Sequence, residues 1–228
     1  KKLGTFGDFG TYSFYYSHQI TSGEGGMVVC KTKEDYEILK MLRSHGWSRD
    51  TSFQNKKKKL YNKLDKRFMF INSGYNLRPT DIQAAIASNQ FKRLKTFMKI
   101  RNENRNKIIE KLENNKKWRN QFHFVPTKNK VTPSWFGLPL IINKVYSKRK
   151  KIFLDFLTSK KIENRPILSG NFLNQPASRL YNFKQKPEEF PNAQDIENLG
   201  FFIGLHTERI SEKNLNYLTT NLLKIDEI

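Results

Sequence analysis

A helical repeat that runs without a break from Thr80 to Leu112 is the feature of this 228-residue sequence that most constrains its fold. Gln83 follows Thr80 by three positions, which is the spacing of a capping box at a helix N-terminus. A helix of this length is unusual in a globular protein, so we expect a kink or a second helix start near Lys95. The chain therefore has one segment before this helix and another after it.

The segment before the helix follows an α/β pattern. Residues 11–16 and 27–30 are rich in β-branched, aromatic and apolar side chains and predict two strands, with a glycine-rich turn at residues 22–26 between them. A helix is expected to begin after the N-cap Thr32 and to end at Gly46. The order strand, turn, strand and helix is typical of an α/β domain.

The segment after about Asn115 alternates short strands and helices and predicts a smaller α+β domain. We therefore predict two domains, at residues 1–114 and 115–228. The expected strands of the second domain are residues 122–125, 135–142, 165–168 and 201–205, and its expected helices are residues 147–159, residues 193–199 and one helix after residue 211.

The chain carries 42 Lys and Arg residues against 21 Asp and Glu residues, which gives a formal net charge of +21. Such an excess favours a polyanionic partner, while the 37% of hydrophobic residues argues against disorder. The basic residues are mostly lysine and are spread along the whole chain, whereas nucleic-acid-binding proteins concentrate arginine on one element. Residues 47–67, with the lysine run 56–59, predict a solvated loop. Nucleic acid is therefore not the favoured partner.

A single cysteine, Cys30, excludes an intrachain disulfide, a four-cysteine zinc site and a four-thiolate iron–sulfur cluster within this sequence. The four histidines lack the spacing of a helical metal site, so we expect no metal. Apolar stretches stay far below the roughly 18 residues that span a bilayer. We expect a cytoplasmic protein that does not enter a membrane.

Two motifs in order carry a resemblance to a known family. The first comprises residues 4–14, His18 and residues 23–26, and the second comprises residues 74–78 and 80–85. They resemble the DegT/DnrJ/EryC1/StrS family of sugar aminotransferases, which use pyridoxal phosphate (PLP). The resemblance implies an α/β fold of the PLP-dependent transferase type (aspartate aminotransferase-like, fold type I). It also implies that residues 1–114 are the C-terminal part of the PLP-binding large domain, that its N-terminal part is absent from this chain, and that residues 115–228 are the small domain.

The informative departure from the aminotransferase pattern is His18. The matching family position holds the lysine that bonds covalently to the cofactor, and an imidazole cannot form that imine. A histidine can still move a proton near neutral pH. This arrangement resembles the deoxysugar 3-dehydratases of the family, which are also similar to this chain at residues 15–21, 42–50, 164–172 and 201–206.

The resemblance implies a 3-dehydratase that removes the C3 hydroxyl of a nucleotide-linked 4-keto-6-deoxyhexose in deoxysugar (lipopolysaccharide O-antigen) biosynthesis. Its cofactor would be PLP and pyridoxamine phosphate, regenerated by L-glutamate, with no iron–sulfur cluster because residues 47–67 contain no cysteine. The expected partners are the nucleotide-diphosphate sugar, L-glutamate and a second copy in a homodimer with shared active sites. A nucleotide-sugar aminotransferase of the same family stays open as an alternative, as does a non-catalytic regulator that binds cofactor or nucleic acid.

We assign roles to seven residues, the first three from the matching family positions and the other four from their place and chemistry. His18 would be the catalytic base, Ser13 would hydrogen-bond the cofactor phosphate, and Asn76 would reach that phosphate from the partner subunit. Simpler alternatives stay open, namely a strand hydroxyl for Ser13 and a turn residue for Asn76. The expected substrate-binding residues are His45, Arg49, Glu163 and Arg165; a cation at a helix C-terminus is the alternative for the first two, and a surface ion pair for the last two.

Overall fold

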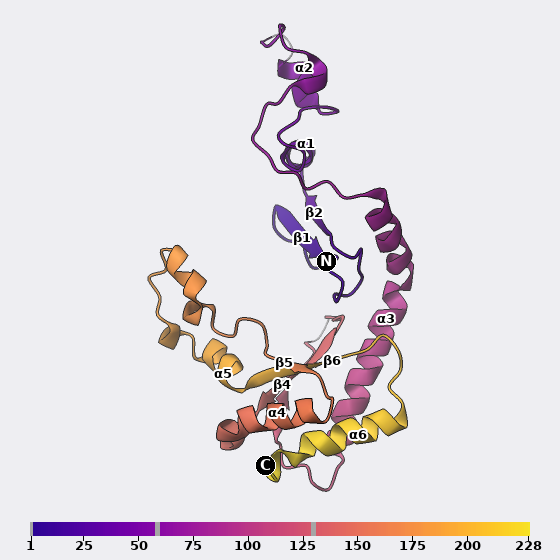
Figure 1. The fold of residues 1–228 in the computed structure, drawn as a ribbon, viewed down its shortest axis with the longest axis vertical. Helices are drawn as coiled ribbons and strands as arrows, with labels where there is room; N and C mark the ends of the chain where they lie inside the picture. The colour runs from indigo at the N-terminus through magenta and orange to yellow at the C-terminus, as the bar shows by residue number, and fades with distance from the viewer. Residues whose placement is uncertain (1, 58–59, 129–130) are drawn as a thin grey trace. The chain divides into compact units, whose positions relative to one another are not determined.

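The computed structural model describes residues 2–57, 60–128 and 131–228, which form two compact units (Figure 1). The first unit comprises residues 1–94 and the second comprises residues 95–228. The domain boundary that the sequence placed after residue 114 is not tested by this division and stays a prediction. No helix in the described part of the chain is long and apolar enough to cross a membrane.

The first unit begins with an antiparallel pair of strands, β1 (Phe9–Ser13) and β2 (Gly26–Cys30), in the register that pairs Tyr12 with Met27. The helix α1 (Lys33–Leu42) follows, and Thr32 caps it because the Thr32 side chain accepts a hydrogen bond from the Asp35 backbone N–H at 3.0 Å. These elements confirm the predicted order of strand, strand and helix.

The described parts of the segment 47–67, residues 47–57 and 60–67, contain more regular structure than the sequence predicted. It contains the short helix α2 (Ser52–Lys57) and the first residues of the 3₁₀ helix η1 (Lys66–Phe68), so the prediction of a plain solvated loop is wrong. A run of polar residues shows no apolar periodicity, and its helix depends on contacts from elsewhere in the chain. Lys58 and Lys59 of the lysine run lie outside the described residues.

The helix α3 (Asp81–Glu113) begins at the predicted capping box. The Thr80 backbone N–H donates to Gln83 Oε1 at 2.9 Å, and the Gln83 N–H donates to Thr80 Oγ1 at 3.3 Å. The helix continues for 33 residues, so the second start expected near Lys95 is wrong. Its later turns bury Ile108 and Leu112 in the core of the second unit, and this burial stabilises a helix longer than local propensity would maintain.

The second unit is built on a four-stranded antiparallel sheet with strand order β3-β4-β6-β5. Its core contains Leu138, Phe153, Phe201 and Leu222, whose side chains are fully buried. The predicted strands and helices are all present, although β5 begins one residue earlier than expected and ends three residues earlier. The strands are β3 (Phe122–Phe124), β4 (Gly137–Ile142), β5 (Asn164–Arg165) and β6 (Gly200–Gly204), and the helices are η2 (Lys144–Arg149), α4 (Lys150–Ser159), η3 (Phe172–Asn174), η4 (Pro176–Leu180), η5 (Pro187–Glu189), α5 (Pro191–Leu199), α6 (Glu212–Leu222) and η6 (Leu223–Asp226).

The two units differ in how much apolar surface they bury. The buried apolar side chains described in residues 2–57 and 60–94 are Ile20, Met41 and Met69. The apolar side chains of Phe9, on β1, and of Met27 and Val28, on β2, are instead 52%, 44% and 47% exposed. Phe9 and Val28 lie on one face of the strand pair and Met27 lies on the other, because successive side chains of a strand alternate, so both faces of the pair expose apolar side chains.

The aromatic core of the second unit makes a prediction about stability. The centroid of the Phe153 ring lies 5.9 Å from that of Phe122 and 6.1 Å from that of Phe201. Phe153→Ala would leave a cavity between these rings. We expect a loss of about 3–5 kcal/mol in the free energy of unfolding, measured by urea denaturation. Ile152→Ala on the same helix, at a 60% exposed position, is the matched control and should cost less than about 0.5 kcal/mol. Equal losses in the two variants would contradict the described core.

A second prediction concerns pH. Glu197 Oε2 accepts hydrogen bonds from Asn174 Nδ2 at 3.0 Å and from the Asn171 backbone N–H at 2.8 Å, and these bonds lower the pKa of the Glu197 carboxyl. Because the pKa is lower in the folded state, the stabilisation is present above the unfolded-state pKa and is lost as the pH falls through the folded-state pKa. The difference in unfolding free energy between the wild type and Glu197→Gln should therefore shrink between about pH 7 and about pH 3. The exposed Glu110→Gln is the control, and a difference independent of pH would refute the prediction.

Candidate active site

His18 lies in a loop that connects the two strands of the first unit. The loop is ordered, because the Phe14 N–H donates to Gly25 O at 2.9 Å and the Ser22 N–H donates to Phe14 O at 3.0 Å. Within it, the His18 N–H donates to Tyr15 O at 3.1 Å, and the Tyr15 ring meets the half-buried His18 ring edge-on at 5.5 Å. The backbone turn and the tyrosine together orient the imidazole.

Ser13 ends β1 at the start of the same loop. Its side chain is exposed, and Ser13 Oγ accepts a hydrogen bond from the Tyr15 N–H at 3.3 Å. The far side of the loop is tied to the start of α3, because Gln83 Nε2 donates to Glu24 O at 2.9 Å. The structure therefore brings Ser13 and His18 onto one braced loop.

His45 and Asn76 lie on two paired backbone segments. The His45 N–H donates to Tyr75 O at 2.8 Å, the Leu77 N–H donates to Arg43 O at 2.9 Å, and Ser44 and Asn76 form an isolated β-bridge. His45 is exposed and adopts a left-handed backbone conformation with φ of 61°. The second sequence motif is thus paired with the residues that follow α1, and this pairing brings His45 close to Asn76.

Arg49 is exposed and lies over an aromatic ring. Its guanidinium carbon is 5.2 Å from the centroid of the Trp47 ring, which is a cation–π distance. The Trp47 ring is stacked with the rings of Phe68 and Phe70 at centroid distances of 6.2 and 6.3 Å. Sequence analysis gave no role to Trp47, although a tryptophan two residues before an arginine in a polar segment was an available signal.

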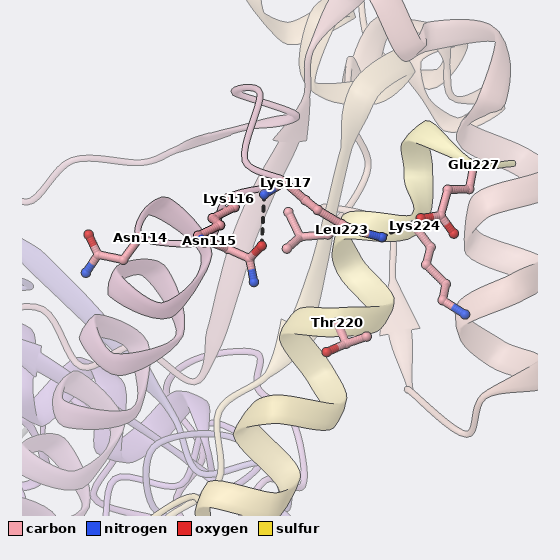
Figure 2. Close-up of a pocket in the computed structure, with 8 residues that line it drawn as sticks. All are labelled: Asn114, Asn115, Lys116, Lys117, Thr220, Leu223, Lys224 and Glu227. Atoms are coloured by element: carbon pink, nitrogen blue, oxygen red, sulfur yellow. Dashed lines mark hydrogen bonds and ion pairs between the residues drawn. The ribbon is translucent and has the colours of Figure 1, made fainter.

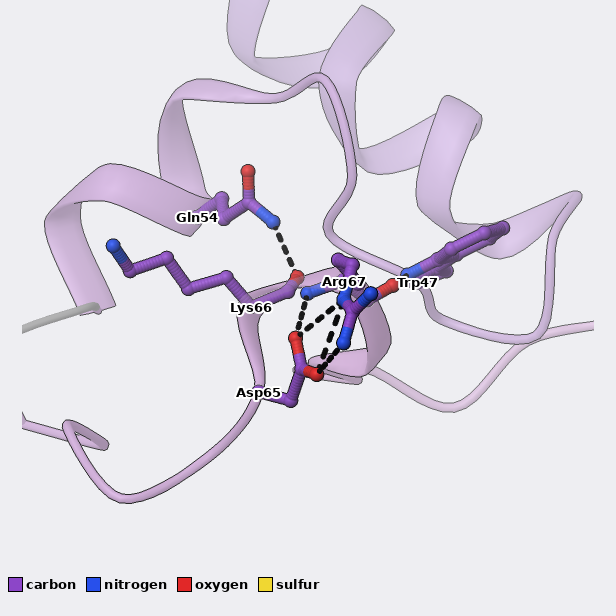
Figure 3. A network of polar contacts seen from close by, with 5 residues as sticks. All are labelled: Trp47, Gln54, Asp65, Lys66 and Arg67. Carbon is purple, nitrogen blue, oxygen red and sulfur yellow. Dashed lines mark hydrogen bonds and ion pairs between the residues drawn. The ribbon is translucent and has the colours of Figure 1, made fainter.

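A polar network holds the indole ring of Trp47 (Figure 3). Trp47 Nε1 donates to Arg67 O at 2.7 Å, and Gln54 Nε2 donates to Lys66 O at 2.6 Å. Asp65 Oδ1 accepts a hydrogen bond from Arg67 Nε at 3.2 Å and Asp65 Oδ2 accepts one from Arg67 Nη2 at 2.7 Å, and these bonds lower the pKa of the exposed Asp65 carboxyl. The segment that was expected to be a plain loop therefore supports the ring beside Arg49.

Glu163 and Arg165 lie in the second unit, next to β5 and within it. Arg165 Nη2 lies 2.7 Å from Glu163 Oε1, and both side chains are well exposed. This geometry matches the surface ion pair that sequence analysis left open, and a pair of this kind contributes little to stability. The seven predicted residues thus fall into two groups, one in each unit.

A cavity of about 540 Å³ in the second unit is lined by none of these seven residues (Figure 2). It lies between the end of α3 and the C-terminal segment, and Lys117 Nζ forms an ion pair with Glu227 Oε1 at 2.9 Å at its edge. Within the described ranges, no group of three or more His, Cys, Asp or Glu side chains could hold a metal ion. The lining residues are Asn114, Asn115, Lys116, Lys117, Thr220, Leu223, Lys224 and Glu227.

Solved structures identify the class of fold. The structure of Escherichia coli GDP-4-keto-6-deoxy-D-mannose-3-dehydratase with bound hydrated PLP matches with a TM-score of 0.81 and 32% identity, over 97% of this chain and 56% of that one. A Helicobacter pylori aminotransferase involved in pseudoaminic acid biosynthesis matches with a TM-score of 0.80 over 100% of this chain and 55% of that one. Its identity is 22%, so it shows the fold alone. The protein has the α/β fold of the PLP-dependent aminotransferases, which confirms the predicted fold class.

A sequence model of the DegT/DnrJ/EryC1/StrS aminotransferase family matches residues 1–221, and the chain belongs to this family. It is 33% identical to GDP-4-keto-6-deoxy-D-mannose 3-dehydratase of Escherichia coli over 96% of this chain and 55% of that protein. It is 31% identical to the Yersinia pseudotuberculosis protein of the same name, over 98% of this chain and 56% of that one. The chain thus spans about half the length of the curated relatives it matches. The predicted family is confirmed, while the roles of the seven residues stay predictions.

The link between Gln83 and the His18 loop can be tested. Gln83→Ala removes half of the capping box, at a cost of about 1 kcal/mol, and also the bond to Glu24 O. We expect faster amide hydrogen exchange in residues 21–26, measured by mass spectrometry. Gln90→Ala on the same helix is the control, and unchanged exchange in residues 21–26 of Gln83→Ala would show that the link does not brace the loop.

Proposed function

We propose that this chain is part of a PLP-dependent 3-dehydratase that removes the C3 hydroxyl of a nucleotide-linked 4-keto-6-deoxyhexose in deoxysugar (O-antigen) biosynthesis. The observation that carries the proposal is His18, which stands where the family motif places a cofactor-binding lysine. Identities of 33% and 31% to two GDP-4-keto-6-deoxy-D-mannose 3-dehydratases support it. A cytoplasmic location is part of the proposal.

The residues of the loop fit the cofactor. Ser13 presents an exposed hydroxyl at the end of β1, and the half-buried His18 ring follows it on the same braced loop. Ser13 would hold the phosphate of PLP or pyridoxamine phosphate, together with Asn76 from the partner subunit of a homodimer. The bound cofactor supplies an electron sink for bond breaking at the sugar.

His18 moves the proton in this proposal. It would take a proton from the C4′ carbon of the cofactor, a transfer that suits an imidazole because its ring nitrogens can both accept and donate a proton. The edge-on contact with Tyr15 limits the directions that the His18 ring can adopt. A histidine at this position cannot bond covalently to an aldehyde as lysine does, so the cofactor is held by non-covalent contacts.

We assign the charged residues among the seven to substrate binding. Arg49 suits the diphosphate, because a guanidinium binds phosphate oxygens in a bidentate manner, and His45 lies four residues before it. Glu163 and Arg165 would contact the sugar nucleotide by exchanging their mutual ion pair for bonds to the substrate. L-Glutamate is the amino donor that regenerates pyridoxamine phosphate.

A nucleotide-sugar aminotransferase is the second candidate. GDP-perosamine synthase of Escherichia coli is 26% identical over 92% of this chain, so a relative named for an amino sugar also matches most of the sequence. The two functions differ in their products, because a dehydratase releases ammonia whereas an aminotransferase leaves an amino group on the sugar.

The proposal predicts ammonia release when the purified protein is given PLP, L-glutamate and GDP-4-keto-6-deoxymannose. His18→Asn should slow the release about 100-fold or more, since a positioned acid–base group contributes 10²–10⁴-fold. Ser17→Ala in the same turn is the control and should keep the rate. An amino sugar without ammonia would favour the aminotransferase, and undiminished release by His18→Asn would refute the role of His18.

A further inference from the structure

The side chains of α1 hold the turn that carries Arg49. Glu37 is 6% exposed, and its Oε2 accepts hydrogen bonds from the Ser52 backbone N–H at 3.0 Å and from Ser52 Oγ at 2.5 Å. One helical turn further on, Lys40 Nζ donates to Asp50 O at 3.2 Å. The side chains of α1 therefore hold the turn at Asp50 and at Ser52, and Arg49 lies directly before Asp50.

The turn itself has little freedom. Ser48 is fully buried, and both its N–H and its Oγ donate to Met69 O, at 3.0 and 2.8 Å. Thr51 Oγ1 donates to Ser48 O at 2.7 Å. Asp50 adopts a left-handed conformation with φ of 59°, which aspartate adopts more readily than most non-glycine residues. These hydrogen bonds fix the backbone on both sides of Arg49.

The buried carboxylate is the group that α1 contributes to this arrangement. A buried charge is tolerated only when it is hydrogen-bonded, so removal of one partner leaves the other unsatisfied. The two bonds from Ser52 therefore couple Glu37 to the end of the turn, across a sequence separation of 15 residues.

We propose that Glu37 is a positioning residue for Arg49, which would hold the diphosphate of the nucleotide sugar. By fixing Ser52, Glu37 keeps the turn in this conformation and keeps the Arg49 guanidinium over the Trp47 ring. The ligand class is a nucleoside diphosphate. The ligand role rests on the proposed function, whereas the hold of Glu37 on the turn does not.

A double-mutant cycle with GDP as the probe tests the coupling. Arg49→Gln should weaken GDP binding by the purified protein about tenfold, since hydrogen bonds to charged groups are worth this much or more. Glu37→Ala should weaken it about three- to tenfold alone and by no further amount in the Arg49→Gln background, because coupled residues are not additive. Glu37→Gln keeps an acceptor for Ser52 and should restore most of the affinity. The exposed Glu34→Ala on the same helix is the matched control.

A merely structural role for Glu37 would give a different result. Glu37→Ala would then weaken GDP binding equally with and without Arg49, and this outcome would overturn the proposal. If Glu37→Ala does not fold, Ser52→Ala replaces it in the cycle, because it removes one of the same two hydrogen bonds.

Hydrogen exchange separates this inference from the proposed function. Glu37→Ala should raise the exchange rate of the Ser52 amide at least tenfold while β1 and β2 exchange as in the wild type. If GDP fails to bind the wild type, the proposed substrate is wrong, and the exchange rates alone decide whether Glu37 holds the turn. Unchanged exchange at Ser52 would overturn the positioning role whatever the affinity for GDP.

Discussion

The first unit depends on the backbone pairing between the residues that follow α1 and the segment that precedes α3. The Tyr75 N–H donates to Leu42 O at 2.6 Å, and the His45 N–H donates back to Tyr75 O at 2.8 Å. This close approach needs glycine at two points. Gly46 has a left-handed φ of 84°, and a Cβ added there would collide with Asn72 O, while one at Gly74 would lie 2.5 Å from the Gly46 nitrogen. This backbone pairing sets the positions of His45, Asn76 and the start of α3.

Near these paired segments, side-chain contacts hold the predicted site residues in place. The Tyr15 ring contacts the His18 ring, and the Trp47 ring lies beside Arg49. Glu37 fixes the turn that joins Arg49 to α2. The net charge of +21 by itself favours a polyanionic partner. The proposed site assigns only a few of the basic residues to such a partner. A diphosphate needs only one or two well-placed guanidinium groups, so most of the basic residues are left as solvated surface.

The sequence predicted the features that rest on local interactions and missed those that join distant residues. The caps at Thr32 and Thr80 were predictable, because each is a hydrogen bond over three residues. The bonds from Ser52 to Glu37 could not be predicted, since no local pattern brings those residues together. The second helix start near Lys95 was wrong for a related reason, because tertiary burial of the later turns of α3 stabilises one long helix. His18 was a candidate because it lies between a predicted strand and a glycine-rich turn, where functional residues often occur, whereas its role as a base came only from the departure from a family motif.

The account depends most on residue 18 acting as a proton carrier rather than as a covalent anchor for the cofactor. The direct measurement is borohydride reduction of the purified protein with stoichiometric PLP, followed by peptide mapping by mass spectrometry. The account predicts no lysine peptide labelled at one equivalent in the wild type, and one equivalent of label at residue 18 in His18→Lys. One equivalent of label on a single lysine of the wild type would contradict it, because the cofactor would then be held covalently without His18.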